Sequence, residues 1–345
     1  MEDINGWMAA WIWTGLKDKK LRWCLGIIVK NRDKSLILQA LQAGVVRIFE
    51  NHSLSSTVLA SFSSRQAGIA GEERVADLFR KHSFTMDHRI IHDISLSAST
   101  LFQMDSLFLT SSYALIFEVK NISGRLKFTE NPPQLIRTRA DGQVDGFDSP
   151  AAQVERYVVL LDEWLQGRGI RLPVIGVVVL AYPKQIVEQA PSKTRILFPN
   201  LIPSYIRSLS TLPIKLERDK LDWLTAEILR SHQRYIPDPL CEIYNIAKRH
   251  IRTGVECEVC GMLGMDKVLR NWHCKRCGNN NKLAHEKAIK EWFLLFGGKM
   301  TNRDCRKFLQ IDDLHSATRI LQSMNLRSDG AKRNRSYYMD VTENQ

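Results

Sequence analysis

The sequence has no run of about 20 apolar residues, the length that a membrane-spanning helix needs. Its N-terminal apolar runs are short and are broken by Lys17, Asp18, Lys19 and Lys20. A secretory signal begins with basic residues and continues with a longer apolar region, which is a different order from the one found here. We therefore expect a cytoplasmic protein without a membrane span. Residues 1–28 could be a docking helix or a poorly ordered extension.

A disulfide framework is also missing, because the seven cysteines are an odd number and four of them form two Cys-x-x-Cys pairs. A metal site in a reducing compartment explains this pattern better. Apolar residues make up 44% and charged residues 25% of the chain, as in ordinary globular proteins. The 345 residues are enough for two or three domains.

Acidic residues are too few to balance the basic ones, and the formal net charge is +12. Such an excess favours an anionic partner, either nucleic acid or an acidic membrane surface. Residues 246–345 hold 19 Lys and Arg against 11 Asp and Glu, so most of the excess lies there. This asymmetry indicates a basic C-terminal module.

The order of expected elements predicts an α/β domain around a mixed sheet, spanning about 67–210. Residues 174–182 are a β-branched run typical of a strand buried on both faces. The serine-rich segment 51–66 is expected to connect its neighbours. We expect helices over 34–48, 67–82, 151–166 and 220–235, and strands over 88–96, 103–110, 113–121, 174–182 and 195–198.

Three charged residues lie in the apolar hairpin "QMDSLFLTSSYALIFEVK". With Ser111 and Ser112 at its tip, the register places Asp105 directly opposite Glu118 on the same face. Strand alternation adds Lys120 to that face. A slip of one residue would move Asp105 to the other face, and Ser-Ser is not a strong turn signal.

Two facing carboxylates in an apolar sheet repel each other, and burial adds to the cost. Mg²⁺ would relieve this repulsion, since it takes one or two carboxylates, a substrate phosphate and waters. Lys120 would then steady the attacking water or the developing negative charge. An isolated Glu-x-Lys would more simply be a salt bridge at a strand end, but the facing Asp105 favours the metal.

Three motifs occur in order: "GIAGEERVADLF", "QMDSLFLTSSYALIFEVKNISG" and "SPAAQVERYVVLL". Together they resemble the NERD domain, the nuclease-related domain of the PD-(D/E)xK superfamily, over roughly residues 65–200. The resemblance implies a restriction-endonuclease-like core and a metal-dependent phosphodiesterase site.

The resemblance also implies which residues carry the chemistry. Glu73 lies next to Glu72, which leaves open which of the two faces the site. Met104 and Ser106 stand where the family more often has Ile and His, a change that removes no ligand, and Gln103 also fits the pattern. The implied catalytic residues are Glu72, Asp105, Glu118, Lys120 and Gln153, with Asp105 and Glu118 as the ligands of Mg²⁺ or Mn²⁺.

The spacing C-x2-C-x13-C-x2-C predicts a four-thiolate site. That ligand set suits zinc, with an iron–sulfur cluster as the less favoured alternative. Four ligands leave no open position, so the zinc would be structural. A redox dithiol would not need two matched pairs. The predicted ligands are Cys257, Cys260, Cys274 and Cys277.

The residues around these cysteines are basic and aromatic, and include Arg270, Trp272, Lys275 and Arg276. Such a surface suits nucleic acid, although zinc ribbons also mediate protein contacts.

The segment 284–341 resembles a winged helix-turn-helix domain. Thr301 would cap a first helix, Asp312 or Asp313 would cap a second, and the basic stretch from Arg327 would form the wing. A small helical bundle for oligomerisation is the alternative. The expected DNA-facing residues are His315, Ser316, Thr318 and Arg319 in the second helix, and Arg327, Lys332, Arg333 and Arg335 in the wing.

These features together predict a Mg²⁺-dependent deoxyribonuclease, delivered to DNA by C-terminal modules. RNA as a partner and an oligomeric state both stay open. The alternative is a non-catalytic DNA-binding or regulatory protein with an inactive nuclease-like domain. The expected divisions are an N-terminal extension at 1–64, the nuclease-like domain at 65–210, a helical linker at 211–250, a zinc ribbon at 251–282 and the winged-helix-like domain at 283–345.

Overall fold

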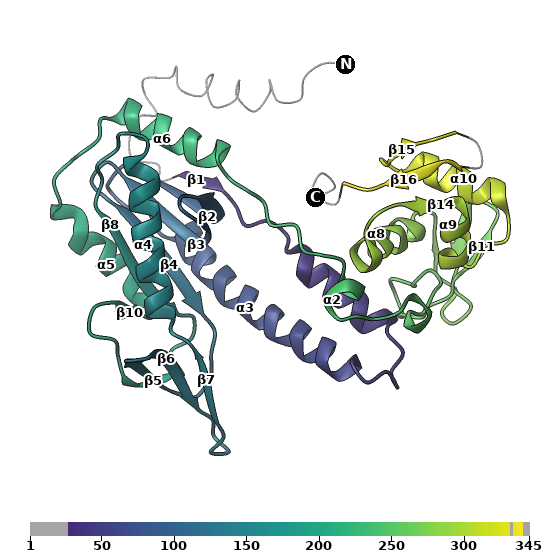
Figure 1. Cartoon of the computed structure of the whole chain (residues 1–345), viewed down its shortest axis with the longest axis horizontal. Coiled ribbons are helices and arrows are strands. Elements are labelled where there is room, and N and C mark those ends of the chain that lie inside the picture. The colour runs from purple at the N-terminus through teal and green to yellow at the C-terminus, as the bar shows by residue number, and fades with distance from the viewer. Residues whose placement is uncertain (1–26, 332–333, 341–345) are drawn as a thin grey trace. The chain divides into compact units, whose positions relative to one another are not determined.

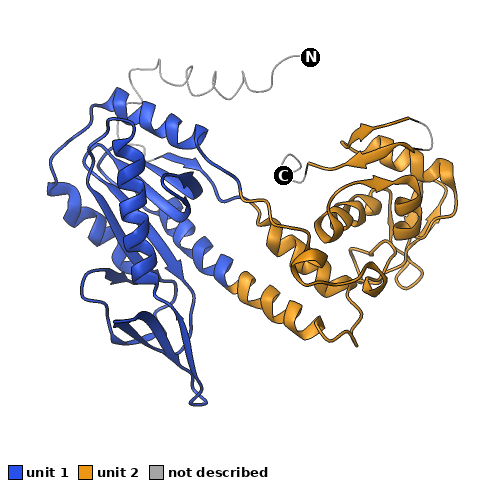
Figure 2. Cartoon of the chain, viewed as in Figure 1, with its two compact units in different colours: residues 1–33, 68–234 blue, residues 34–67, 235–345 orange. Residues whose placement is uncertain are grey.

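The computed structural model describes residues 27–331 and 334–340, which form parts of two compact units (Figure 2). Unit 1 combines the residues up to Asp33 with Gly68–Arg234, and unit 2 combines Lys34–Ala67 with the residues from Tyr235 onward. Helix α3 (Ser55–Lys81) contributes to both units. The expectation for the first 26 residues lies outside the described range. No described helix is long and apolar enough to cross a bilayer.

Unit 1 is built around a six-stranded mixed sheet, which confirms the predicted α/β class. β2 to β4 form an antiparallel meander, whereas β1, β8 and β10 pair in parallel with their neighbours. The strands, in sheet order, are β1 (Ile27–Lys30), β2 (His88–Ser97), β3 (Leu101–Thr110), β4 (Ala114–Lys120), β8 (Val174–Leu180) and β10 (Arg195–Leu197).

Helices cover both faces of this sheet (Figure 1). α4 (Pro150–Gln166) and α6 (Arg218–Arg230) pack on the face that includes Ile116. The C-terminal part of α3 and α5 (Ile202–Ser208) pack on the face that includes Phe117. Because successive side chains alternate between faces, a strand buried on both sides needs the continuous apolar sequence seen in β4 and β8.

Unit 1 has a second sheet that was not expected, with three strands in the polar stretch after the hairpin and a fourth after β8. Leu126, Phe128 and Leu135 are fully buried and form its small core. One apolar face is enough to stabilise this sheet, which explains why its sequence looks polar overall. The sheet order is β7 (Val144–Asp148), β6 (Pro133–Thr138), β5 (Arg125–Glu130) and β9 (Ile186–Gln189).

The expectation that residues 51–66 merely connect their neighbours is wrong, because helix α3 begins at Ser55. Val58 is fully buried within the core of unit 2. The cost of serine in a helix is a few tenths of a kcal/mol per residue, so packing of one face overrides it.

Unit 2 has one continuous hydrophobic core. Buried residues from α2, the four-cysteine segment and the C-terminal helices all belong to it. Its helices are α2 (Leu36–Arg47), the N-terminal part of α3, α7 (Leu240–Ile243), α8 (Ala284–Phe296), α9 (Asn302–Leu309) and α10 (Leu314–Ser323), and its strands are β11 (Asp266–Val268), β12 (Asn271–His273), β13 (Asn280–Asn281), β14 (Met300–Thr301), β15 (Arg327–Asp329) and β16 (Ser336–Tyr338).

A buried ion pair links the two sequence segments of unit 2. The Arg47 side chain is fully buried, and its Nε donates to Glu291 Oε2 at 2.7 Å. Its Nη1 also donates to the carbonyls of Arg252 and Gly254, each at 3.1 Å. The guanidinium lies 4.5 Å from the ring centroid of Phe308. Residues 34–48 are therefore a structural part of unit 2.

Candidate active site and nucleic-acid interface

The hairpin of β3 and β4 adopts the predicted register. Its ladder pairs Leu109 with Ala114 and runs to Ser106 opposite Phe117, so the next position places Asp105 opposite Glu118. Backbone pairing between the two strands ends there. Asp105 Oδ2 instead accepts a hydrogen bond from the backbone N–H of Val119, at 2.8 Å. The register therefore brings the two carboxylates to one end of the hairpin.

Glu118 is a buried acid with one oxygen unsatisfied. Its side chain is 3% exposed, Oε1 lies 2.7 Å from Lys120 Nζ, and Oε2 has no hydrogen-bond partner among the described residues. Burial, reinforced by the charge of Asp105, raises the pKa of Glu118 to about 8. Burial also raises the pKa of Asp105, against the effect of its backbone N–H donor. The two acids repel each other in a site of low polarity, as expected for facing carboxylates.

Lys120 is held between two side chains. Burial alone would lower its pKa, but the ion pair with Glu118 outweighs this effect and raises it. Lys120 Nζ also donates to Gln153 Oε1 at 3.2 Å, and Gln153 Nε2 donates to Tyr157 Oη at 2.9 Å. Helix α4 therefore brings Gln153 to the lysine, as expected from the motif order. Sequence reasoning missed Tyr157, which lies one helical turn beyond Gln153 on the same face.

The structure distinguishes Glu72 from its neighbour. Glu72 forms an ion pair with Arg32, and its charge helps to raise the pKa of Glu118. Glu73 instead pairs with Arg80 on the exposed side of α3. The helix approaches the strand ends closely at Gly71, where an added Cβ would lie 2.9 Å from Asn121 Cβ.

Arg32 is a site residue that sequence reasoning missed. It follows β1, in the segment expected to be an N-terminal extension, and that strand pairs in parallel with β2. Its Nη1 is buried with no partner in the described ranges, and its charge lowers the pKa of Asp105 against the stronger effect of burial. No local sequence signal links a residue at this position to a hairpin more than 70 residues later.

Two other positions near the hairpin have partners outside the proposed catalytic set. Gln103 Nε2 donates to Asp93 Oδ1 at 2.5 Å. Ser106 Oγ lies 2.8 Å from His92 Nδ1, and both side chains are buried. Burial lowers the pKa of His92 to about 4, so this imidazole is neutral. Neither Gln103 nor Ser106 contacts Lys120 or Glu118 through a described hydrogen bond.

The four cysteines converge on one point. Their sulfurs all lie within 4.8 Å of one another, with 3.6 Å between Cys257 and Cys277 and 3.5 Å between Cys260 and Cys274. Four thiolates at about 2.3 Å from a shared zinc ion would be about 3.8 Å apart, which is close to these separations. In the described part of the chain, this is the one group of three or more such ligand side chains. The described acids of unit 1, including Asp105 and Glu118, form no such group of three.

Both Cys-x-x-Cys turns have the same backbone design. Gly261 N–H donates to the Cys257 carbonyl at 2.9 Å, and Gly278 N–H donates to the Cys274 carbonyl at 2.8 Å. Both glycines have a left-handed φ, of 70° and 74°, that side chains disfavour. Backbone N–H groups, that of Cys260 first, lower the pKa of Cys257 to about 6. The backbone donors therefore favour the thiolate form of Cys257 and Cys274. At Cys277 the backbone N–H of Asn279 also lowers the pKa, but burial and the neighbouring cysteines outweigh it and raise the pKa to about 12.

The aromatic residue expected at the four-cysteine surface is not on the surface. Trp272 is fully buried, and its indole Nε1 donates to His285 Nδ1 at 3.0 Å. The indole is therefore unavailable for stacking on a base. Arg270, Lys275 and Arg276 are exposed as expected, and Lys275 forms an ion pair with Asp266 at 2.8 Å.

The C-terminal segment forms two helices followed by a hairpin. Thr301 and Asp304 make a capping box at the start of α9, and Asp313 rather than Asp312 caps α10. β16 pairs with both β15 and β14, so the hairpin closes a small sheet. His315 and Arg319 are exposed, whereas Ser316 and Thr318 are half-buried. Lys332 and Arg333 lie outside the described residues.

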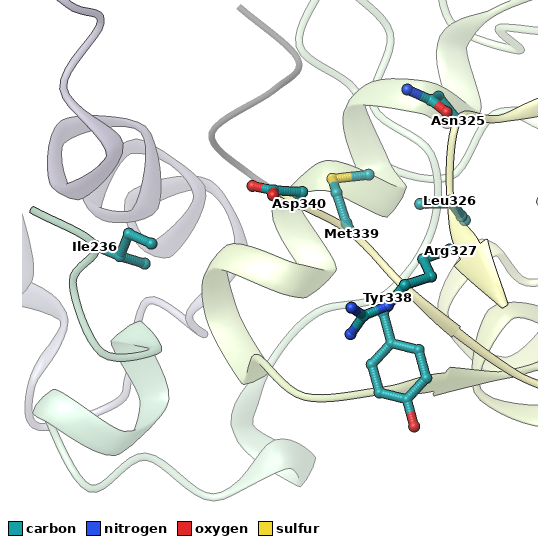
Figure 3. Close-up of a pocket in the computed structure, with 7 residues that line it drawn as sticks. All are labelled: Ile236, Asn325, Leu326, Arg327, Tyr338, Met339 and Asp340. Carbon is teal, nitrogen blue, oxygen red and sulfur yellow. The ribbon is translucent and has the colours of Figure 1, made fainter. Parts of the chain in front are cut away.

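The base of this hairpin borders a hollow of about 500 Å³ (Figure 3). Arg327 and Tyr338 face each other across β15 and β16, with the guanidinium 5.3 Å from the ring centroid. Ile236 and Met339 also line it. Arg335, expected near the tip of the wing, is half-buried, and its Nε has no partner within the described part of the chain.

Residues 67–181 match the family model of the NERD domain, described as a nuclease-related domain. The match covers one third of the chain and includes the hairpin, α4 and the part of α3 that carries Glu72. The predicted resemblance to the NERD domain is thereby confirmed for residues 67–181, which form a nuclease-related domain. No curated protein and no solved structure matches the chain.

Proposed function

We propose that the protein is a metal-dependent nuclease that hydrolyses phosphodiester bonds of DNA. One observation carries the proposal. Within a nuclease-related domain, Glu118 is buried with an unsatisfied oxygen and faces Asp105, while Lys120 lies 2.7 Å from its other oxygen. A buried acid pair of this kind is costly for stability, and metal binding is the chemistry that would use it.

Asp105 and Glu118 are the proposed ligands of Mg²⁺ or Mn²⁺. When bound, such an ion polarises a phosphodiester and lowers the pKa of a coordinated water. Glu118 would hold the ion as a carboxylate, and its Oε2 would then have the partner that it lacks in the protein alone. Asp105 keeps its orientation through the backbone N–H that it accepts.

Lys120 is the proposed catalytic cation. Its raised pKa keeps it protonated, so it can donate a hydrogen bond to the attacking water or to the phosphate oxygen that gains charge. Gln153 and Tyr157 hold the ammonium in place from α4. Glu72 is proposed to act on the same site from α3, with Arg32 as its counterion.

Unit 2 is proposed to deliver the nuclease domain to nucleic acid. The four cysteines would hold a structural zinc ion, and α9, α10 and the hairpin would form a winged-helix-like module. The proposed nucleic-acid contacts are Arg270, Lys275, Arg276, His315, Ser316, Arg319, Lys332, Arg333 and Arg335. A non-catalytic DNA-binding protein is the second candidate, favoured only by the lysine–glutamate ion pair that an inactive site could also keep.

The decisive experiment is a nuclease assay on linear, circular and single-stranded DNA with Mg²⁺ or Mn²⁺. Asp105→Asn and Lys120→Met should abolish cleavage, and both should leave DNA binding largely unchanged. Glu73→Gln is the matched control, since Glu73 pairs with Arg80 on the exposed side of α3, and it should retain cleavage. Full activity of the Asp105 and Lys120 variants would contradict the site, and DNA binding by an inactive wild type would favour the second candidate.

A further inference from the structure

Four cationic side chains line one cleft in unit 2, and no carboxylate of the described residues lines it. The cleft has a volume of about 860 Å³. Its cations are Lys267, Arg270, Lys282 and Arg319. Lys267 and Lys282 were not among the residues expected to bind nucleic acid.

The walls of the cleft come from the two modules that the sequence treats separately. β11 and its turn into β12 carry Lys267 and Arg270, and Lys282 follows β13. The other wall is one face of α10, where Ser316 and Arg319 are three residues apart. Figure 1 shows β11 and α10 in the same part of unit 2. Because both modules share one hydrophobic core, the walls are held together.

Among the four cations in this cleft, only Arg319 forms an ion pair with a carboxylate of the described residues. Lys267 Nζ donates to two carbonyls, those of Leu269 at 2.7 Å and Asn271 at 3.3 Å. Burial and the charge of Arg319 lower the pKa of Lys267. Arg319 itself lies 3.9 Å from the nearest carboxylate oxygen of Asp313. An anion in the cleft would relieve this repulsion.

A neutral histidine forms part of the wall of the cleft. His285 lines the cleft and is 6% exposed. Its Nδ1 accepts the indole N–H of Trp272, so the proton of the neutral ring is on Nε2. Burial lowers the pKa of His285 to about 4, against the effect of the backbone of Lys282, and this keeps the ring neutral. His285 therefore adds no charge to the cleft, and its proton faces the same segment that carries Lys282.

The rim of the cleft is apolar and exposed. Leu269 is 93% exposed at the tip of the β11–β12 turn, and Leu283 is 58% exposed beside Lys282. An inorganic anion would gain nothing from these leucines. A polymer with alternating anionic and less polar groups could contact the cations and the leucines together.

We propose that this cleft binds the sugar–phosphate backbone of a nucleic-acid strand, with phosphates on the four cations and sugars or bases against the two leucines. The proposal rests on the proposed function for the choice of nucleic acid as the anion. The proposal changes the expected role of α10. Ser316 and Arg319 would contact the sugar–phosphate backbone together with the four-cysteine module, instead of contacting bases in the major groove. Binding in the cleft is therefore expected to depend little on sequence.

The test is the fluorescence anisotropy of labelled oligonucleotides with the full zinc-loaded chain, in the Lys120→Met background so that no DNA is cut. Arg270→Gln and Lys282→Gln change exposed side chains and should leave the fold intact. For each phosphate that a variant no longer neutralises, the slope of log affinity against log salt should fall by about 0.9 on duplex DNA or about 0.7 on a single strand. Duplex DNA, single-stranded DNA and RNA are separate arms, and the arm with the largest change identifies the strand.

Lys299→Gln is the matched control, since Lys299 is an exposed lysine of unit 2 that does not line the cleft. It should keep the slope of the parent protein. Arg270→Gln and Lys282→Gln with slopes equal to that of Lys299→Gln on every arm would overturn the proposal. So would competition by polyglutamate as effective as that by unlabelled DNA, because it would identify an acidic protein segment as the partner.

The two proposals fail separately. If the wild-type chain does not cut DNA but Arg270→Gln and Lys282→Gln lower the salt slope, the nuclease assignment is wrong and the cleft stands. If the wild-type chain cuts DNA and these variants bind like the control, only the cleft is wrong.

Discussion

Metal binding to the acid pair should release a proton from Glu118. In the metal-free protein the pKa of this carboxyl is raised to about 8, chiefly by burial. At pH 7, below that pKa, more of the molecules carry this proton than at pH 8, and the carboxylate form is the one that pairs with Lys120. The ion binds the carboxylate form, so it must first displace this proton at a cost of about 1.4 kcal/mol per pH unit.

The affinity for Mn²⁺ should therefore rise with pH. From the titration of one group we expect a gain of about tenfold between pH 6 and pH 7, and about fivefold between pH 7 and pH 8. Calorimetry in buffers of different ionisation enthalpy should report the release of protons on binding, with more protons released per ion at pH 7 than at pH 8. The affinity rises with pH because the pKa of Glu118 is raised: below that pKa the carboxyl is protonated, and it must lose the proton before it can bind the ion.

Two variants test the assignment to Glu118. Glu118→Gln should bind Mn²⁺ weakly and release no proton. Asp105→Asn should also bind weakly, and because it removes the neighbouring charge that raises the pKa of Glu118, it should release fewer protons at pH 7. An affinity that stays flat from pH 6 to pH 8, with no proton released by the wild type, would refute the reasoning.

Three further predictions concern the scaffold. Glu291→Ala should lower the free energy of unfolding by about 3–5 kcal/mol in urea titrations, because Arg47 is then buried without its carboxylate, and an Arg47→Met/Glu291→Leu double variant should recover most of the loss. Cys274→Ser should reduce bound zinc from one ion per chain to none, remove a stabilisation on the order of 10 kcal/mol and abolish the near-ultraviolet circular dichroism of unit 2; an unchanged spectrum would contradict a structural zinc. Gly68→Ala should raise the melting temperature by a few degrees, whereas Gly71→Ala should lower it, since only the second Cβ meets other side chains.

The hairpin register was predictable because its determinants are local. Two residues at the tip and alternation along each strand are enough to place Asp105 opposite Glu118. The same holds for the four-cysteine spacing and for the Thr301 cap, whose partners lie within a few residues. Short loops leave few alternative arrangements, so the sequence pattern alone selects one.

Other features had no local signal. Arg32 reaches Glu72, and Arg47 reaches Glu291 across 244 positions, through contacts that exist only when the units have folded. The helix that begins at Ser55 lies where a connection was expected. Its stability comes from packing of side chains such as Val58 in the core of unit 2 rather than from the helix propensity of its serines.

The sequence alone was enough to predict which carboxylates face each other, which lysine accompanies them and which four cysteines cluster. The surroundings of those groups depend on the tertiary structure. It buried Trp272 rather than exposing it, brought Arg32 to the acids and assembled the basic cleft from two modules. The physical reason is that spacing in the chain sets contacts between near neighbours, whereas burial and distant pairing depend on the packing of the whole core.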